Sequence, residues 1–261
     1  MEDSGTRGGE MGRHLTATEC GSGRSDHTTG VRPEMQWAMI FDVDGVIADT
    51  EALNARASVL MFEQLYSTRV QSEDFREFVG TGDERYVEGV AEKYGVTIDT
   101  EAAVERRREN FFTLLQNEPL PAMDGVLALV DAAVQADDCL VAIATSGNKN
   151  KQFPVIEGTG LDRSRFDAVI TGDDVTRKKP DPQIYLVTAE RLGIEPARCV
   201  VFEDAPAGVE AAKAAGMLCV AVTSSVDAGK LQAADIVVDS LAEVDIDGLR
   251  ELVASHASPS G

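Results

Sequence analysis

The sequence predicts a doubly wound α/β fold, in which helices cover both faces of a parallel sheet. Short, almost uninterrupted apolar segments are typical of parallel strands that are buried on both faces. Helical patterns separate most of these segments, and such alternation implies right-handed crossovers between parallel strands. One long helical insert follows the first strand and predicts a smaller second subdomain. The expected strands are residues 37–41, 140–144, 168–170, 199–202, 219–222 and 236–238.

The 261 residues divide into four parts of different character, one of which is interrupted by another. The first is rich in Gly, Ser, Thr and charge and has no apolar period, which predicts a disordered tail. Its acidic residues and its lack of an apolar stretch disfavour a transit peptide and a secretory signal. We expect this tail over residues 1–35, a sheet-containing core over 36–50 and 119–250, a helical insert over 51–118, and a second tail over 251–261.

The insert is predicted to be an all-helical cap, because it contains helical patterns and no strand pattern of weight. Thr100 is a plausible N-cap of its last helix, and Pro119 and Pro121 mark the exit of the chain. We expect the cap to lie over the edge of the sheet. Its four helices are expected over residues 51–66, 72–79, 83–94 and 101–117.

Helices are also expected between the later strands of the core. Pro206 lies where a first-turn proline belongs, and Gly193 and Gly216 lie where a glycine ends a helix. The turn at Ser146 and Gly147 is expected to open a further helix, whose free N–H groups could bind an anion. The other three helices are expected over residues 125–136, 182–192 and 207–215.

The composition limits the classes of binding partner and the cellular compartment that we expect for this protein. With 24 Lys and Arg against 45 Asp and Glu, the formal charge is −21, which argues against nucleic acid and anionic membranes as partners. No apolar stretch reaches the roughly 18 residues of a membrane span. The cysteines suit a reducing compartment, so we expect a cytoplasmic protein without a disulfide framework or zinc site. The sequence carries no signal for an oligomeric state. The four cysteines are Cys20, Cys139, Cys199 and Cys219.

Histidine is absent from the expected core and cap, because the three histidines, His14, His27 and His256, lie near the ends of the chain. A Ser–His triad, an HExxH zinc site and phosphotransfer through histidine are therefore not expected. Any catalysis must depend on carboxylates, Lys, Ser or Thr.

Four polar clusters follow expected strands, either directly or within a few residues. In an open parallel sheet, ligands bind outside the carboxyl ends of the strands, so we expect the clusters to converge at one edge. The clusters are Asp42-Val43-Asp44-Gly45, Thr145-Ser146-Gly147-Asn148, Lys178-Lys179-Pro180-Asp181 and Glu203-Asp204.

The residue types in these clusters are complementary. Two carboxylates 4 Å apart repel each other by ~4 kcal/mol at an effective dielectric constant of about 20, so grouped carboxylates need a cation. Oxygen ligands favour Mg²⁺, which also recruits phosphate. A lysine, a hydroxyl and the N–H groups of a helix N-terminus suit the remaining phosphate oxygens. The edge of the sheet is therefore expected to bind Mg²⁺ and phosphate.

Each cluster also has a purely structural interpretation. Asp42 and Asp44 fit an Asp-Gly turn, and Thr145 or Ser146 fits a helix N-cap. The two lysines fit a solvated pair. The pair at Glu203 fits an interaction with the dipole of the following helix.

The four clusters together resemble the motifs of the haloacid dehalogenase (HAD) superfamily. Asp42-Val43-Asp44-Gly45-Val46 is similar to its DxDG[TV] signature, Thr145 to its second motif, Lys179-Pro180 to its third and Glu203-Asp204 to its fourth. The motifs run in order from about residue 37 to about residue 245, and the helical insert resembles the cap of the β-phosphoglucomutase-like branch. The resemblance implies a Rossmann-like core with an inserted cap.

The resemblance implies a role for each matching residue. Asp42 would be the nucleophile that forms an aspartyl phosphate, and Asp44 the general acid and base. Thr145 and Lys179 would hold the transferring phosphoryl group, and the Lys179–Pro180 peptide would be cis. Mg²⁺ would be held by Asp42, Asp44 through its backbone carbonyl, and Asp204, with support from Glu203. Candidates for substrate binding are Ser146, Gly147, Thr50, Asn54 and Thr81.

The expected activity is that of a Mg²⁺-dependent phosphatase acting on a small phosphorylated metabolite, with sugar phosphates as the class that the resemblance implies. Asp44 argues against dehalogenases and phosphonate hydrolases, which resemble this fold but lack that acid. The alternative is a β-phosphoglucomutase-type phosphomutase. Such mutases carry a cap histidine and arginine where this chain has Asn54 and, approximately, Asp83. A further alternative is an inactive binding protein of the same fold.

Overall fold

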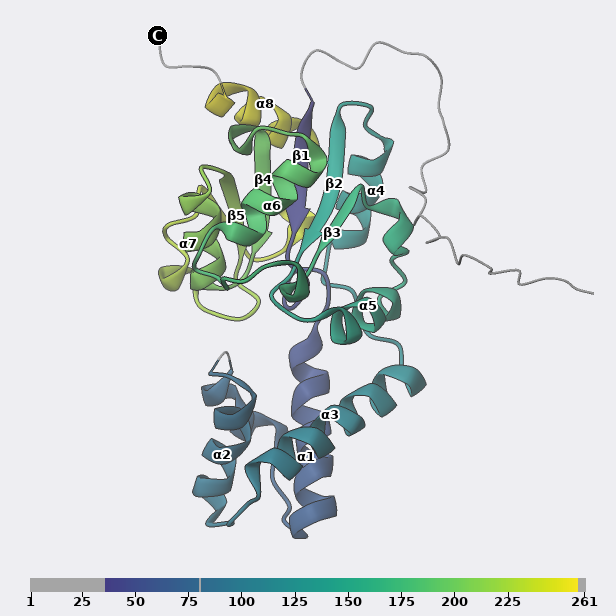
Figure 1. Cartoon of the computed structure of the whole chain (residues 1–261), viewed down its shortest axis with the longest axis vertical. Coiled ribbons are helices and arrows are strands. Elements are labelled where there is room, and N and C mark those ends of the chain that lie inside the picture. The colour runs from purple at the N-terminus through teal and green to yellow at the C-terminus, as the bar shows by residue number, and fades with distance from the viewer. Residues whose placement is uncertain (1–35, 80, 258–261) are drawn as a thin grey trace, which may run out of the picture.

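The six-stranded sheet confirms the predicted doubly wound α/β fold. The structure is a computed structural model that describes residues 36–79 and 81–257, so the expected tail over residues 1–35 lies outside the described part. All neighbouring strands are parallel, in the order β3-β2-β1-β4-β5-β6 (Figure 1). They are β1 (Trp37–Phe41), β2 (Cys139–Ala144), β3 (Ala168–Ile170), β4 (Cys199–Glu203), β5 (Leu218–Val222) and β6 (Ile236–Val238). Each bound lies within one residue of the prediction.

Alternate residues of strands β1 to β5 face opposite sides of the sheet and enter two separate apolar clusters, whereas Val237 of the edge strand β6 is exposed. On β1, Met39 and Phe41 pack in the cluster that includes α4, α5 and α8, whereas Ala38 and Ile40 pack in the cluster that includes α6 and α7. Burial on both faces explains why the strands are apolar throughout. The helices are α4 (Val126–Gln135), α5 (Lys149–Gly158), α6 (Gln183–Leu192), α7 (Pro206–Ala214) and α8 (Ile246–Ala257).

The inserted segment forms a helical cap beyond the carboxyl ends of the strands (Figure 1). Its interior is a separate cluster with Phe62, Phe75 and Tyr86 among its members. Where the cap meets the core, Leu53 of α1 and Phe111 of α3 join the cluster on one face of the sheet. The described cap elements are α1 (Thr50–Tyr66), the 3-10 helix η1 (Ser72–Phe78), α2 (Asp83–Tyr94) and α3 (Thr100–Asn117).

Some local predictions were wrong. η1 is a 3-10 helix that ends at Phe78, not an α-helix to residue 79. The N-cap of α3 is Asp99, whose carboxylate accepts the N–H of Ala102, while the hydroxyl of Thr100 donates to Glu88. Two good capping residues stand next to each other there, so pattern alone could not choose between them.

The expected C-terminal tail is also partly wrong, because α8 continues to Ala257. Residues 251–257 are therefore helical, and residues 258–261 lie outside the described part. Leu249 and Val253 are buried against the sheet, four residues apart on one face of the helix. This packing stabilises a helix that its short apolar pattern did not predict.

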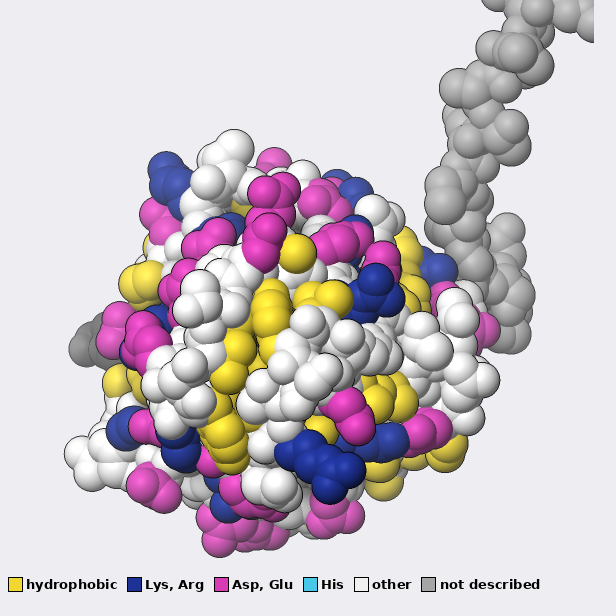
Figure 2. Space-filling view, turned by 90° about the horizontal axis from the view of Figure 1, so that it is seen from below, with side chains coloured by type: hydrophobic (Ala, Val, Ile, Leu, Met, Phe, Trp, Pro, Cys, Tyr) yellow, Lys and Arg dark blue, Asp and Glu magenta, His cyan; other side chains and the backbone are white. Residues whose placement is uncertain are grey.

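The surface at the cap end carries charges of both signs. Figure 2 shows Lys and Arg side chains interspersed with Asp and Glu around a central strip of apolar side chains. Leu65 and Tyr94 are exposed apolar side chains of the cap.

Over residues 36–79 and 81–257, no helix combines the length and apolarity that crossing a bilayer requires.

Candidate active site

Strand register places Asp42 beside Glu203. Phe41, the last residue of β1, pairs with Ile143 of β2 and Phe202 of β4. Asp42 therefore leaves β1 at the level where β4 ends with Glu203. The rings of Phe41 and Phe202 stack with their centroids 4.5 Å apart and are fully buried, which fixes this register from one face of the sheet.

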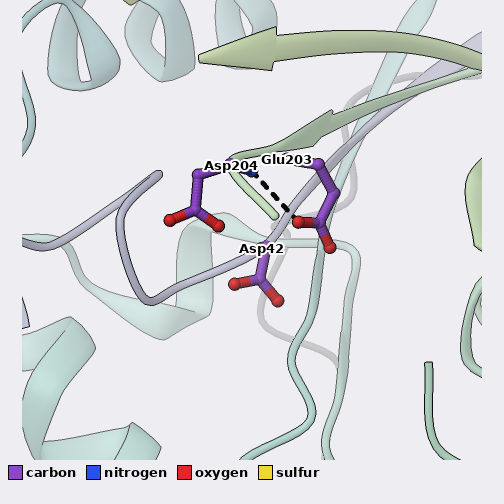
Figure 3. Close-up of side chains that lie close together, drawn as sticks. All are labelled: Asp42, Glu203 and Asp204. Carbon is purple, nitrogen blue, oxygen red and sulfur yellow. Dashed lines mark hydrogen bonds between the residues drawn. The ribbon is translucent and has the colours of Figure 1, made fainter. Parts of the chain in front are cut away.

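Three carboxylates converge at this point. Asp42, Glu203 and Asp204 are all buried, and one oxygen of each lies within 4.8 Å of the others. Figure 3 shows the three side chains directed toward a common space at the end of β1 and β4. An all-oxygen donor set with excess negative charge fits a hard divalent cation. The predicted metal residues are thus brought together, and this cluster could hold such an ion.

Lys179 lies in the same cluster and is the predicted lysine. Its Nζ lies 2.6 Å from Oδ1 of Asp42, 2.6 Å from Oε1 of Glu203 and 3.4 Å from the carbonyl oxygen of Ala144. The side chain is only 9% exposed, whereas Lys178 is exposed, so the solvated-pair interpretation fails for Lys179. The Lys179–Pro180 peptide is cis.

Both carboxylate oxygens of Glu203 are occupied by hydrogen bonds. Oε1 accepts from Lys179 and, at 2.6 Å, from the hydroxyl of Tyr185 on α6. Oε2 accepts the backbone N–H groups of Asp204 and Ala205 at 3.0 and 3.3 Å. Gly208 of α7 packs so closely that a Cβ there would lie 1.9 Å from this carboxylate. Glu203 is therefore fixed more firmly than the other two acids.

Asp204 faces the turn that follows β1. Its Oδ2 accepts the hydroxyl of Ser225, which lies in the loop after β5. Gly45 has a φ of +75°, and a Cβ at this position would lie 1.9 Å from the same Oδ2. Glycine is therefore needed here both for the left-handed backbone and for the approach of Asp204.

Asp44 points to different partners from those of Asp42. Its Oδ1 accepts the hydroxyl of Thr50 at 2.5 Å and lies 3.6 Å from Nζ of Lys151. Its Oδ2 accepts from Nε2 of Gln152 at 2.7 Å. Thr50 begins the cap, whereas Lys151 and Gln152 belong to α5 of the core. Asp44 is thus held between the two parts of the molecule.

The second predicted cluster forms a tight turn before α5. Thr145 is buried, and its Oγ1 accepts the N–H of Gly147 at 3.3 Å. Neither Thr145 nor Ser146 caps α5, because Asn148 does so through its contact with the N–H of Lys151. This result removes the N-cap interpretation of Thr145 and leaves the hydroxyl at the edge of the sheet.

The structure separates three of the candidates for substrate binding from one another. The hydroxyl of Thr50 contacts Asp44, as described above. Asn54 lies one turn later on α1, where its carbonyl accepts from Ser58. Thr81 is exposed, and its hydroxyl donates to the carbonyl of Phe78 within the cap. Of these three candidates for substrate binding, Thr50 is the one that the structure joins to the acidic centre by a hydrogen bond. It was expected in the core, but it is the first residue of the cap helix α1.

Burial and the crowding of negative charge raise the pKa values of Asp42 and Asp204. Burial raises the pKa of Asp42 well above its ordinary value, and Glu203 and Asp204 raise it further, against the lowering effect of Lys179. Burial, with the charge of Glu203, raises the pKa of Asp204 to about 7.

Burial would also raise the pKa of Asp44. The charge of Lys151 and the hydrogen bonds from Thr50 and Gln152 outweigh it and lower the pKa below its ordinary value. Burial would lower the pKa of Lys179, but Asp42 and Glu203 outweigh it and raise the pKa. Lys179 is thus held as a cation and Asp44 as an anion.

Sequence reasoning missed four residues that contact these acids: Lys151, Gln152, Tyr185 and Ser225. Ser225 ends a polar run that directly follows β5, so the strand-end rule that found the other clusters could have found it. Lys151 and Gln152 lie in the first turn of the helix that follows Thr145, where the same rule would have applied more weakly. The apolar pattern of α6 gave no signal for Tyr185.

Together, the fold and the cluster define an α/β enzyme with a helical cap and an acidic centre at the carboxyl ends of its strands. The sequence model of the haloacid dehalogenase-like hydrolase family matches residues 38–216 of this chain. The protein therefore belongs to this hydrolase family.

Individual relatives agree with this assignment. Fructose-1-phosphate phosphatase YqaB of Escherichia coli is 32% identical over 181 residues, which are 69% of this chain and 92% of the relative. Protein SUPPRESSOR OF QUENCHING 1, chloroplastic, of Arabidopsis thaliana is 34% identical over 216 residues. That match covers 81% of this chain but only 20% of the much longer plant protein.

A solved structure shares the architecture, including the sheet and the cap. A variant of CbbY from Rhodobacter sphaeroides in complex with xylulose-(1,5)bisphosphate superposes with a TM-score of 0.66 at 29% identity. The alignment covers 82% of this chain and 99% of the CbbY chain.

Proposed function

We propose that the protein is a phosphatase that hydrolyses a small phosphorylated sugar, with Mg²⁺ as cofactor and an aspartyl phosphate as intermediate. The position of Asp42 carries this proposal. Its carboxylate is buried at the end of the central strand β1, with Lys179 on one side and Asp204 on the other. A carboxylate in this position can attack a phosphate ester whose negative charge is neutralised by a bound cation.

In the first step, an oxygen of Asp42 attacks the phosphorus atom, and the bond from phosphorus to the ester oxygen breaks. Asp44 must bind a proton before this step. It then delivers that proton to the leaving oxygen and becomes the carboxylate, a contribution of roughly 10²–10⁴ in rate for general acid catalysis. Lys179, Thr145 and the N–H of Ser146 hold the oxygens of the transferring phosphoryl group.

In the second step, Asp44 takes a proton from water, and the resulting hydroxide attacks the phosphorus atom of the aspartyl phosphate. The bond between phosphorus and Asp42 breaks, and inorganic phosphate is released. The donors of Thr50, Gln152 and Lys151 favour the carboxylate form of Asp44, which is the form that acts as a base.

Asp42, the backbone carbonyl of Asp44 and Asp204 would hold Mg²⁺. Both oxygens of Glu203 already accept two hydrogen bonds each, so we assign Glu203 a supporting role. When bound, Mg²⁺ would neutralise charge on the phosphoryl group. The buried, repelling carboxylates described above fit such an ion.

The substrate class follows from the cap and from the relatives. A helical cap beyond the strand ends limits access to small esters and excludes water during transfer. The similar E. coli protein is named for fructose 1-phosphate, and the similar CbbY structure contains a sugar bisphosphate. These names support a phosphorylated sugar as substrate.

The test is the release of inorganic phosphate from a panel of sugar phosphates that includes fructose 1-phosphate, in EDTA and after addition of Mg²⁺. We expect turnover only with Mg²⁺. Asp42→Asn should abolish it, whereas Asp131→Asn, which changes an exposed acid of α4 that pairs with Arg165, should not. Absence of turnover across the panel would contradict the proposal.

A phosphomutase would give a different result. Incubation with β-glucose 1-phosphate and a trace of the 1,6-bisphosphate would then yield glucose 6-phosphate without free phosphate. Asp83, which stands near the position of the mutase arginine, is already paired with Arg107 of α3. We therefore expect free phosphate and no isomerisation.

A further inference from the structure

Gln152 is a buried amide that contacts the candidate acid Asp44, and the proposed mechanism uses it only as one of three donors that favour the carboxylate form. The side chain is 0% exposed, and its Nε2 donates to Oδ2 of Asp44 at 2.7 Å. The two residues are 108 positions apart in the chain, so only the packing of α5 against the end of β1 brings them together.

The oxygen atom of the same amide lacks the hydrogen bond that the nitrogen atom makes. Oε1 of Gln152 is buried and has no hydrogen-bond partner among the described residues. A buried polar atom without a partner costs stability, so an apolar side chain of similar size would suit this position better if packing were its only role. The cost indicates that the amide is retained for its contact with Asp44.

The turn before α5 is shaped around this side chain. A Cβ at Gly147 would lie 2.2 Å from Nε2 and 2.7 Å from Cγ of Gln152. Glycine at position 147 therefore leaves the room in which the amide reaches Asp44. The turn at Gly147 and the side chain of Gln152 therefore pack directly against each other.

The partners of Asp44 differ in where they come from. Thr50, which holds Oδ1, is the first residue of α1 and belongs to the cap, whereas Gln152 belongs to the core that also carries Asp42 and Lys179. A movement of the cap changes the contact with Thr50 and leaves the contact with Gln152 in place. Gln152 is thus the partner that fixes Asp44 relative to the nucleophile.

We propose that Gln152 is a positioning residue, which orients Asp44 toward the leaving oxygen of the ester. This inference rests on the proposed phosphatase function. It predicts that loss of the amide weakens proton delivery to the leaving group and spares the attack by Asp42. Esters whose leaving group needs a proton should therefore suffer most.

The experiment compares Gln152→Met with the wild type on two substrates, in Mg²⁺. Methionine has a similar size and no donor. Fructose 1-phosphate has a strongly basic leaving group, whereas p-nitrophenyl phosphate has a weakly basic one that leaves without help. We expect kcat/KM to fall roughly 10- to 100-fold on fructose 1-phosphate. The fall on p-nitrophenyl phosphate should stay within about threefold, because the acid contributes little there.

Two further measurements separate positioning from a structural role. The melting temperature of Gln152→Met should stay close to that of the wild type, because removal of the unpartnered buried oxygen offsets the lost hydrogen bond to Asp44. Gln135→Met, at the exposed end of α4, is the matched control and should leave both substrates unaffected. If Gln152→Met does not fold, Gln152→Leu also removes the donor without adding a charge beside Asp44, and it should show the same selective loss.

Equal losses on the two substrates, or no loss on either, would overturn the inference. Failure of the proposed function would look different, because the wild-type protein itself would then release no phosphate from either ester. Activity of the wild type together with an unselective Gln152→Met variant would therefore refute the positioning role alone.

Discussion

Lys179 and Asp42 form a buried ion pair that joins residues 137 positions apart, with Nζ and Oδ1 separated by 2.6 Å. The same ammonium contacts Glu203, so one cation faces two of the three clustered acids. Asp204 contacts Ser225 instead and, with Asp42, has a raised pKa. The balance of charge in this small volume leads to the first three predictions.

Asp42→Asn should abolish turnover and leave the fold intact. The nucleophile is lost, so kcat should fall by at least about 1,000-fold. Repulsion from Glu203 and Asp204 is also removed, so in EDTA the melting temperature should equal or exceed that of the wild type. The measurements are phosphate release and thermal unfolding. Near-normal activity in the variant would show that another residue attacks phosphorus.

Lys179→Met should destabilise the protein as well as inactivate it. Removal of one member of a buried ion pair leaves uncompensated charge and costs about 3–5 kcal/mol. Urea unfolding should show this loss, whereas Lys178→Met, at the exposed neighbouring position, should change stability by less than about 0.5 kcal/mol. Equal stability of the two variants would mean that the buried pair contributes no net stability.

The contribution of Asp204 to the stability of the metal-free protein should fall as the pH rises from about 4 to about 7. The folded state raises the pKa of Asp204 from its ordinary value of 3.8 to about 7, so in this range the folded protein binds a proton that the unfolded chain has released. The stability from this group is present below pH 3.8 and is lost as the pH passes through 7.

Asp204→Asn should remove this part of the pH dependence. Urea unfolding in EDTA at pH 5 and pH 7.5 gives the free energy of unfolding of both proteins. The difference between variant and wild type should move in favour of the variant at the higher pH. A difference that does not change with pH would show that Asp204 has an ordinary pKa in the folded protein.

Gly45→Ala should lower both stability and activity. Alanine at a φ of +75° costs roughly 1–2 kcal/mol, and its Cβ would displace the carboxylate of Asp204. Gly95→Ala is the matched control, because Gly95 has a φ of +66° and open space around its Cβ position. The control should lose similar stability and keep its Mg²⁺-dependent turnover. If both variants keep full turnover, Asp204 does not need its present position.

The strands were predictable because a strand that is buried on both faces appears in the sequence as a nearly continuous apolar segment. The strand-end rule then located Asp42, Thr145, Glu203 and Asp204, since parallel strands bring their carboxyl ends to one edge. Helix ends were less predictable, because Asp99 and Thr100 are both good caps and only packing chooses between them.

Contacts between the helices and the sheet produce no comparably clear pattern in the sequence. Gln152 reaches Asp44 because of the position at which α5 packs, and Tyr185 reaches Glu203 from the buried face of α6. Their polar atoms look like ordinary members of a helix until the tertiary structure is known. The sequence pattern therefore indicated the acids clearly, gave only a weak signal for Lys151 and Gln152, and gave none for Tyr185.

The apolar cluster inside the cap has a practical consequence. Because Phe62, Phe75 and Tyr86 pack with one another and apart from the sheet, most of the cap carries its own source of stability. Transplanting the cap of a related hydrolase onto this sheet, with the junctions at Leu53 and Phe111 preserved, is therefore a rational route to chimaeras with altered selectivity and unchanged chemistry.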